Sequence, residues 1–267
     1  FSYFDVEFSL NARANTATKA LTLTKGILEI DNAATSVVLS SGGGNFTIPS
    51  TASLVLNDGT LSVSGNSTGI DLEGKLEING GMVSVYDASS TNNYIQYYST
   101  GYSELAITGG TLRVGSQIRR LTTTSGGILN YGQSGGTVEV GYSDAPVSNR
   151  GVLEVLNSGS QFSFTGGSLT IYRGQSSASV PSFYIDLAAS DATIAGGTTL
   201  NIGGASGSPQ IGIYLSVPVH QLNIVSSGTP VAKLWNVPLD INGNLTINPG
   251  ATFDANGLDL TVKGDFT

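Results

Sequence analysis

The side chains that most often carry out catalysis or bind metals are scarce in this chain. Its 267 residues include one His, one Met and no Cys, which excludes disulfides, thiolate zinc sites and cysteine nucleophiles. His220 lies among apolar residues in Val219-His220-Gln221-Leu222, and no cysteine ligand can accompany it. We interpret it as a structural or loop histidine, and we predict no cofactor and no metal centre.

The carboxylates are dispersed along the sequence. In an alternating strand the residue between two apolar neighbours faces solvent, so we expect the glutamates in such positions to be solvated. Glycoside hydrolysis needs two neighbouring carboxylates. A β-helical polysaccharide lyase or hydrolase is therefore the alternative interpretation, and it requires carboxylates, with or without Arg, to converge in the folded chain. Four glutamates stand singly between apolar neighbours: Glu29, Glu77, Glu139 and Glu154.

Calcium has only weak candidate ligands, namely isolated loop carboxylates such as Asp87 and Asp144. The nonapeptide Ca²⁺-binding roll needs Gly-Gly-x-Gly-x-Asp in tandem. The nearest match, Gly42-Gly43-Gly44-Asn45, lacks the Asp, so we predict no dedicated calcium site.

Four tyrosines form the one candidate contact surface. Aromatic rings with a polar tip suit stacking on sugars or contact with a protein. In the alternative interpretation, Ile95 and Tyr97 point inward from a strand while the other tyrosines cover the edge of a coil. The tyrosines lie among polar amides in Asn92-Asn93-Tyr94-Ile95-Gln96-Tyr97-Tyr98-Ser99-Thr100-Gly101-Tyr102, and the predicted contact residues are Tyr94, Tyr97, Tyr98 and Tyr102.

Charge and hydropathy exclude several classes of protein. The formal net charge is −8, with only 11 Lys and Arg residues, whereas nucleic-acid binding needs clustered basic side chains. No apolar run approaches the ~20 residues of a transmembrane helix. A hydrophobic content of 39% with 11% charged residues does not fit intrinsic disorder. We predict no nucleic-acid partner and no direct membrane insertion.

The elements that must position these residues are short β-strands. Apolar and polar residues alternate from Phe4 to Leu10, and short alternating segments such as Leu61-Ser62-Val63 and Leu260-Thr261-Val262 recur to the end. No stretch of ten or more residues has the apolar spacing of an amphipathic helix. The sequence therefore predicts an all-β fold.

A repeated motif indicates how the strands are arranged. Gly, a small or unbranched residue and an apolar-polar-apolar triplet recur six times. The marker Gly of the copies is at 59, 81, 110, 136, 167 and 197; it is preceded by a further Gly in every copy except the first, which has Asp58 there. A fixed motif at irregular spacing is typical of stacked coils with loops of variable length. Because a tight corner between strands favours φ > 0, it favours Gly. In this register Arg113 and Glu139 occupy the same slot of consecutive coils, and we expect them to pair.

We predict a right-handed parallel β-helix (β-solenoid) of about nine or ten coils. At ~4.8 Å per strand the rod is ~45 Å long. A β-sandwich or β-barrel is the alternative, but those folds reverse direction by hairpins. Residues 1–267 are interpreted as a single solenoid segment of a longer protein. The stretch near 205–240, which holds four of the eight prolines, is expected to be rich in loops because Pro cannot donate to a strand ladder.

The copies Gly109–Gly115 and Gly135–Gly141, with Leu-Thr-Ile-Asn-Pro-Gly-Ala-Thr-Phe at 245–253, resemble the repeats of large β-helical surface or secreted proteins of Gram-negative bacteria. These include autotransporter passengers and the long adhesin-like proteins exported by type 9 secretion. The resemblance covers most of residues 20–267 and concerns composition and period, so it transfers no site residue. It implies export across the outer membrane and an extracellular or cell-surface location.

We therefore expect a non-enzymatic adhesin, stalk or matrix component of the cell surface. Its expected partners are a glycan or a host or substratum surface, together with the secretion and outer-membrane anchoring machinery that the resemblance implies. No catalytic residue is predicted.

Overall fold

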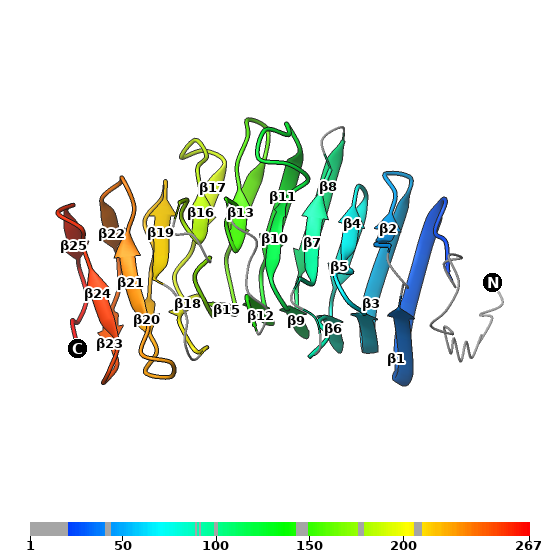
Figure 1. Ribbon diagram of the computed structural model, residues 1–267, viewed down its shortest axis with the longest axis horizontal. Coiled ribbons are helices and arrows are strands. Elements are labelled where there is room, and N and C mark those ends of the chain that lie inside the picture. The colour runs from blue at the N-terminus through cyan, green and yellow to red at the C-terminus, as the bar shows by residue number, and fades with distance from the viewer. Residues whose placement is uncertain are drawn as a thin grey trace.

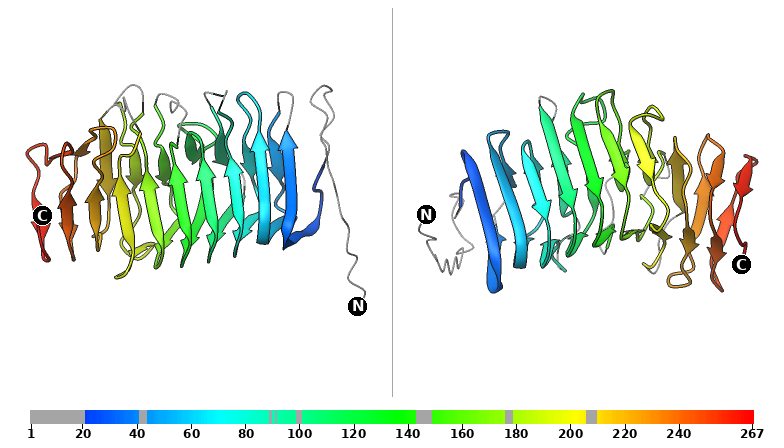
Figure 2. Two further views of the ribbon diagram at one scale, coloured as in Figure 1. Left: turned by 90° about the horizontal axis from the view of Figure 1, so that it is seen from below. Right: turned by 180° about the vertical axis from the view of Figure 1, so that it is seen from behind.

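The computed structural model describes residues 21–40, 44–88, 90, 92–98, 101–142, 149–175, 179–205 and 210–267. In these ranges it contains β-strands, turns and bends, and no helix long and apolar enough to cross a membrane. The parallel strands stack into an elongated solenoid (Figures 1 and 2), which confirms the predicted fold class. The solenoid has about eight turns, slightly fewer than the nine or ten coils predicted, and its third face is a nine-stranded sheet. The predicted strand from Phe4 to Leu10 lies outside the described residues.

Each turn of the solenoid runs along three faces. Two long strands, β1 (Gly26–Ser40) and β3 (Ala52–Ser64), pass around the corner between the first and second faces. The first half of β3 pairs with β5 (Lys75–Ile78) and its second half pairs with β6 (Met82–Val85). The 14-stranded sheet therefore makes up two faces of the rod, which meet at this corner.

The remaining strands follow the same three-face order. The first face holds β5, β8 (Tyr102–Ile107), β11 (Ile128–Gln133), β14 (Gln161–Phe164) and β17 (Ala192–Ile194), and near the C-terminal end the pair β22 (Leu239–Ile241) and β25 (Leu260–Val262). The second face holds β6, β9 (Thr111–Val114), β12 (Thr137–Val140), β15 (Ser168–Ile171), β18 (Thr199–Ile202), β20 (Leu222–Ile224) and β23 (Leu245–Ile247). The third face holds β2 (Phe46–Ile48), β4 (Ile70–Leu72), β7 (Tyr94–Tyr97), β10 (Gln117–Arg120), β13 (Leu153–Val155), β16 (Phe183–Ile185), β19 (Ile211–Leu215), β21 (Val231–Leu234) and β24 (Thr252–Asp254).

The glycine motif marks the first residues of the second face in every copy. The six copies lie in one parallel register, and two further turns, in β20 and β23, continue it without the Gly-Gly pair. The sixth copy has one extra residue, which the corner before β18 absorbs. There the Thr198 hydroxyl donates to the Ala195 carbonyl (2.7 Å). The aligned inward positions are Leu61, Val83, Leu112, Val138, Leu169 and Leu200.

The corners bring the backbones of successive turns into direct contact. A Cβ on Gly109 would lie 2.3 Å from the Asn79 carbonyl oxygen, closer than real Cβ atoms come to any atom. Gly110 has φ +63°, and its Cβ would lie 2.5 Å from the Gly80 oxygen. The Gly pair is therefore required both by the left-handed backbone and by the closeness of the preceding turn.

Apolar side chains fill the interior as ladders that run along the rod. Leu54, Leu76 and Leu105 stack on the first face and are fully buried. Each buried side chain of this size stabilises the fold by about 1.5–3 kcal/mol. The next turn carries a polar exception, because the hydroxyl of the buried Tyr131 donates to Gln133 Oε1 (2.7 Å) in the same interior. This hydrogen bond satisfies the buried hydroxyl, as burial requires.

Strands and loops alternate in the described part of the proline-containing stretch. Residues 210–240 include β19, β20 and β21 and the start of β22. Pro218 and Pro238 lie between strands, and Pro230 directly precedes β21, so none of the three removes a donor from within a strand. The solenoid therefore continues through this stretch; Pro209 lies outside the described residues.

Replacing Gly110 by Ala tests the corner contact. We expect Gly110→Ala to lower the free energy of unfolding by more than the ~1–2 kcal/mol of a left-handed backbone alone, because the Cβ also meets the preceding turn. Urea unfolding followed by circular dichroism measures this. The matched control is Gly132→Ala in β11, where a Cβ meets no atom within 4 Å and stability should change little or rise by up to ~1 kcal/mol. Equal losses in both variants would contradict the role of the corner.

Candidate functional site

The four predicted contact tyrosines do not form one surface. Tyr94 and Tyr97 belong to β7 on the third face, Tyr98 follows them, and Tyr102 begins β8 on the first face. Tyr97 is fully buried, as is Ile95, which agrees with the inward-facing interpretation of this strand. Tyr94 and Tyr98 are half-buried, and only Tyr102 is exposed, at 51%. The structure thus distributes the candidate residues over two faces and the interior.

Tyr94 is one member of a polar network on the outer side of the third face. Asp71, Gln96 and Arg119 occupy neighbouring positions on successive strands. The Gln96 amide donates to Asp71 (2.7 Å), and the Arg119 guanidinium lies over the Tyr94 ring, 3.9 Å from its centroid. The Asn45 amide also donates to Asp71 (2.7 Å). These contacts connect four consecutive turns.

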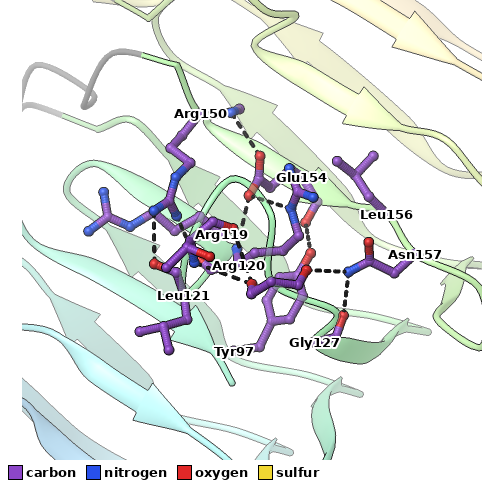
Figure 3. A network of polar contacts seen from close by, with 12 residues as sticks. Tyr97, Arg119, Arg120, Leu121, Gly127, Arg150, Glu154, Leu156 and Asn157 are labelled. Atoms are coloured by element: carbon purple, nitrogen blue, oxygen red, sulfur yellow. Dashed lines mark hydrogen bonds and ion pairs between the residues drawn. The ribbon is translucent and has the colours of Figure 1, made fainter. Parts of the chain in front are cut away.

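The network continues to a buried glutamate in the next turn (Figure 3). Glu154 Oε1 accepts hydrogen bonds from Arg120 Nε (3.2 Å) and from the Arg120 amide (2.9 Å). Its Oε2 accepts a hydrogen bond from the Gly151 amide (3.1 Å). The Tyr97 hydroxyl donates to the Glu154 carbonyl (3.0 Å) from inside the solenoid. Glu154 is thus held from both sides of the sheet.

The expectation that Glu154 is solvated is wrong. Glu154 is only 1% exposed, because part of the return between β12 and β13 lies against the outer side of the sheet. In that return, Arg150 donates to the carbonyls of Arg120 and Leu121, and Gly151 contacts Glu154 directly. Strand alternation alone predicts an outward side chain, but it says nothing of a loop that covers it. Glu29 is exposed, as expected.

The arginines near Glu154 are unusually buried for their charge. Arg119 is 7% exposed, its Nη1 donates to Gln117 (2.7 Å), and its Nε has no hydrogen-bond partner in the described part of the chain. Burial, helped by the neighbouring Arg150, lowers the pKa of Arg119 to about 10. Tyr94 and Glu154 oppose this shift. Arg119 therefore remains positively charged at neutral pH.

Three guanidinium groups, those of Arg119, Arg120 and Arg150, lie near the enclosed carboxylate of Glu154. A general base must reach the proton that it removes. Both oxygens of Glu154 accept hydrogen bonds from the protein, and the side chain has almost no contact with solvent. Within the described ranges, no group of three or more His, Asp or Glu residues is placed to hold a metal ion. Asp87 Oδ2 accepts a hydrogen bond from the Gly65 amide (3.0 Å), and Asp144 lies outside the described residues.

The predicted pairing of Arg113 with Glu139 is confirmed. Arg113 Nε lies 2.7 Å from Glu139 Oε2 on adjacent strands β9 and β12. Two tyrosines complete the cluster: Arg113 lies 4.0 Å from the centroid of the Tyr142 ring, and the Tyr172 hydroxyl donates to Glu139 (2.8 Å). Burial, together with Glu139, raises the pKa of Tyr172 to about 12. The motif register predicted the ion pair, but not the tyrosines that follow each strand.

His220 lies at the corner that leads into β20. A Cβ on Gly196 of the preceding turn would lie 3.3 Å from Nε2 of His220, and a Cβ on Gly243 of the next turn would lie 3.0 Å from its Nδ1. Its Nδ1 is buried without a hydrogen-bond partner among the described residues. The position takes the place of a glycine corner, in agreement with a structural role.

The third face also carries aromatic residues that the sequence analysis did not single out. Tyr184 and Tyr214 stand opposite each other on β16 and β19, and Trp235 follows β21. Each comes after a buried apolar residue and is half-buried. The apolar-aromatic-apolar alternation of Phe183-Tyr184-Ile185 and Ile213-Tyr214-Leu215 could have indicated them. Only the register shows that they are neighbours.

Comparison of the chain with protein-family models, with curated proteins and with solved structures finds no match. The functional interpretation therefore rests on the geometry of this chain.

Neutralising Glu154 should destabilise the fold strongly. Glu154→Gln keeps a hydrogen-bond acceptor but removes the negative charge beside three arginines, and breaking a buried pair in this way costs about 3–5 kcal/mol. The matched control is Glu29→Gln at an exposed glutamate, which should change stability by less than ~0.5 kcal/mol. Chemical denaturation of both variants measures the difference. Similar effects at the two positions would contradict a stabilising role for the network.

We expect the buried Tyr97 to make the fold less stable at alkaline pH. Burial, with a contribution from Glu154, raises its pKa well above 10, while the unfolded chain ionises tyrosine near pH 10. Above pH 10 the unfolded state therefore loses a proton that the folded state keeps, and Tyr97 alone lowers stability by about 1.4 kcal/mol per pH unit. Tyr97→Phe should remove this contribution, as measured by urea unfolding from pH 9 to 11.

The comparison of slopes isolates this hydroxyl. Arg119, whose pKa is lowered, changes stability in the opposite direction, but it does so in the parent and the variant alike. Phe162→Leu, which alters the same interior without removing a hydroxyl, serves as the control and should keep the parental slope. If Tyr97→Phe also kept that slope, the assignment to Tyr97 would be wrong.

Proposed function

We propose that this chain is a non-enzymatic, surface-exposed or secreted bacterial β-solenoid that serves as an adhesin, a stalk or a matrix component. The observation that carries the proposal is the continuous parallel stack of about eight turns, with ladders of side chains bonded along its outside. Solenoids of this kind present long surfaces and are extended along one axis. A rod whose turns are hydrogen-bonded to one another can act as a stalk that holds a binding element away from the cell. It can also act as an adhesin that contacts a broad surface along its length.

Outer side chains bonded between turns support this role. The amide of Asn248 donates to Asn223 (2.6 Å), and the amide of Asn223 donates to Asn201 (2.9 Å), along three turns of the second face. Lys75 bridges Glu77 (2.8 Å) and Glu104 (3.3 Å) on the first face. Such pairs are individually weak, at about 0–1 kcal/mol, but they recur along the rod.

Export across the outer membrane and anchoring there belong to the same proposal. The repeat motif that resembles bacterial surface proteins is also the motif that forms the corners of this solenoid. A glycan or a host or substratum surface is the proposed partner. Secretion and outer-membrane anchoring machinery are the further partners that this location requires.

A polysaccharide lyase or hydrolase is the second candidate. The convergence of Glu154 with Arg119, Arg120 and Arg150 favours it, because lyases combine carboxylates with basic side chains. The enclosure of Glu154 favours a structural role instead. Incubation with polygalacturonate and with neutral glycans, followed by reducing-end and ultraviolet measurements, distinguishes the two, and we expect no cleavage.

Adhesion is tested with the isolated chain. Beads coated with folded protein should bind a cultured epithelial surface or a glycan array better than beads coated with the heat-unfolded chain, because binding depends on side chains arranged by the solenoid. Failure in both assays would contradict adhesion by this segment. Protease treatment of intact cells followed by immunoblotting tests the surface location, and protection of the chain would contradict it.

A further inference from the structure

Three aromatic residues form a row on the outer side of the third face, and we call Tyr184, Tyr214 and Trp235 the aromatic strip. Their strands β16, β19 and β21 are neighbours in the nine-stranded sheet (Figure 1). Tyr184 pairs directly with Tyr214 in the ladder. Leu234 pairs with Ile213, and Trp235 follows Leu234 in the chain. The backbone amide of Trp235 donates to the Ile213 carbonyl (2.9 Å). The strip therefore runs along the rod, one ring per turn.

The rings are placed by close packing. The centroids of Tyr184 and Tyr214 are 5.1 Å apart, with an interplanar angle of 64°. The benzo edge of Trp235 lies over Gly212 on β19, where Cε3 is 3.2 Å from the position that a Cβ would occupy. Because residue 212 has no side chain, the indole can lie close to the neighbouring strand. The strip is therefore positioned before any ligand arrives.

The aromatic strip is partly accessible, whereas Arg119 and Glu154, at outer positions of the two preceding turns, are buried. All three rings are half-buried, but Glu154, one strand before Tyr184, is 1% exposed. Turn length accounts for the difference at Tyr214, since the step from Leu200 to Leu222 that contains it is 22 residues and the step from Val138 to Leu169 that contains Glu154 is 31. Tyr184 lies in the step from Leu169 to Leu200, which is also 31 residues. Shorter turns have less chain to fold over the sheet. Tyr214 and Trp235 thus lie where the turns shorten, and Tyr184 lies one turn before them.

Hydrogen-bonding groups border the rings. The Tyr214 hydroxyl donates to the exposed Asp186 (3.4 Å). On the other side Lys233 pairs with Asp254 (3.3 Å), and Asn256 beyond Trp235 donates to the Leu234 carbonyl (3.1 Å). The border contains carboxylate, amide and hydroxyl groups, and the Lys233 ammonium is paired with Asp254.

We propose that the aromatic strip binds a linear, neutral polysaccharide whose chain lies along the rod. Electron-rich ring faces attract the polarised C–H groups on the flat side of a pyranose. Neighbouring strands are ~4.8 Å apart, which is close to the advance of one sugar unit in an extended β-1,4-linked chain. The bordering carboxylate and amide groups accept and donate hydrogen bonds to sugar hydroxyls. The inference deepens the proposed adhesive role and rests on it.

Charge selects neutral over acidic polysaccharides. The chain carries a net charge of −8, and the two carboxylates at the strip, Asp186 and Asp254, are accessible to solvent. Like charges repel at short range, so a chain of uronic acids or sulfated sugars is disfavoured. Cellohexaose and chitohexaose are suitable neutral probes, and hexagalacturonate is the acidic comparison.

Trp235 supplies a direct signal because it is the only Trp in the sequence. Titration of the purified chain with cellohexaose or chitohexaose should shift or quench its fluorescence and saturate. Hexagalacturonate should bind at least about tenfold more weakly. A flat titration with both neutral probes would overturn the proposal. Equal binding of hexagalacturonate would overturn the assignment to neutral glycans.

Variants locate the site independently of fluorescence. In isothermal titration calorimetry, Trp235→Ala and Tyr214→Ala should each weaken binding of the better neutral probe by about tenfold or more. The matched control is Tyr102→Ala, an exposed tyrosine on the first face, which should bind like the parent. Circular dichroism verifies that each variant is folded. If Trp235→Ala does not fold, Trp235→Phe, which retains an aromatic ring, takes its place.

The outcomes separate this inference from the proposed function. Cell or surface adhesion that survives Trp235→Ala and Tyr214→Ala would overturn the assignment of the adhesive site to the aromatic strip. It would at the same time support an adhesive role through another surface. Neutral-glycan binding that both strip variants leave unchanged would also overturn the strip. Loss of glycan binding and of adhesion in the same two variants would support both proposals.

Discussion

The stacking of each turn on the next depends on direct backbone contact at the corner between the first and second faces. At Gly80, Gly109 and Gly166 a Cβ would stand 2.1–2.3 Å from a carbonyl oxygen of the preceding turn. Those carbonyls cannot move away without disturbing the ladder hydrogen bonds on either side. Glycine at the corner therefore keeps successive turns at the strand spacing, and this spacing brings like residues into contact along the rod.

Once the corners are fixed, the returns between the second and third faces can vary with little effect on the interior. Long returns provide chain that covers the outer side of the third face, which is how Arg119 and Glu154 become buried. Short returns leave Tyr214 and Trp235 at the surface. Local chemistry on this rod is therefore decided by loop length and by the residues in the outward slots, while the apolar ladders change little.

The same logic relates structure to the proposed role. The buried network of Glu154 links adjacent turns, and its charged groups form hydrogen bonds with groups of the protein itself. The aromatic strip contributes little to the interior, and its three rings are half-buried on the outer side of the third face. A solenoid of this kind combines a rigid scaffold with binding groups spaced at one ring per turn, which suits repeating ligands better than single small molecules.

The sequence by itself determined the all-β class, the parallel stack and the register. The backbone conformation of the corners requires Gly-Gly, and burial of one side of each strand requires apolar alternation. Both requirements act on neighbouring residues, so the sequence shows them directly. Arg113 and Glu139 were paired correctly for that reason. Only the tertiary structure decided the burial of Glu154, the dispersal of Tyr94, Tyr97, Tyr98 and Tyr102, and the assembly of the aromatic strip. These depend on which return folds over which face, and strand periodicity carries no information about the path of a loop.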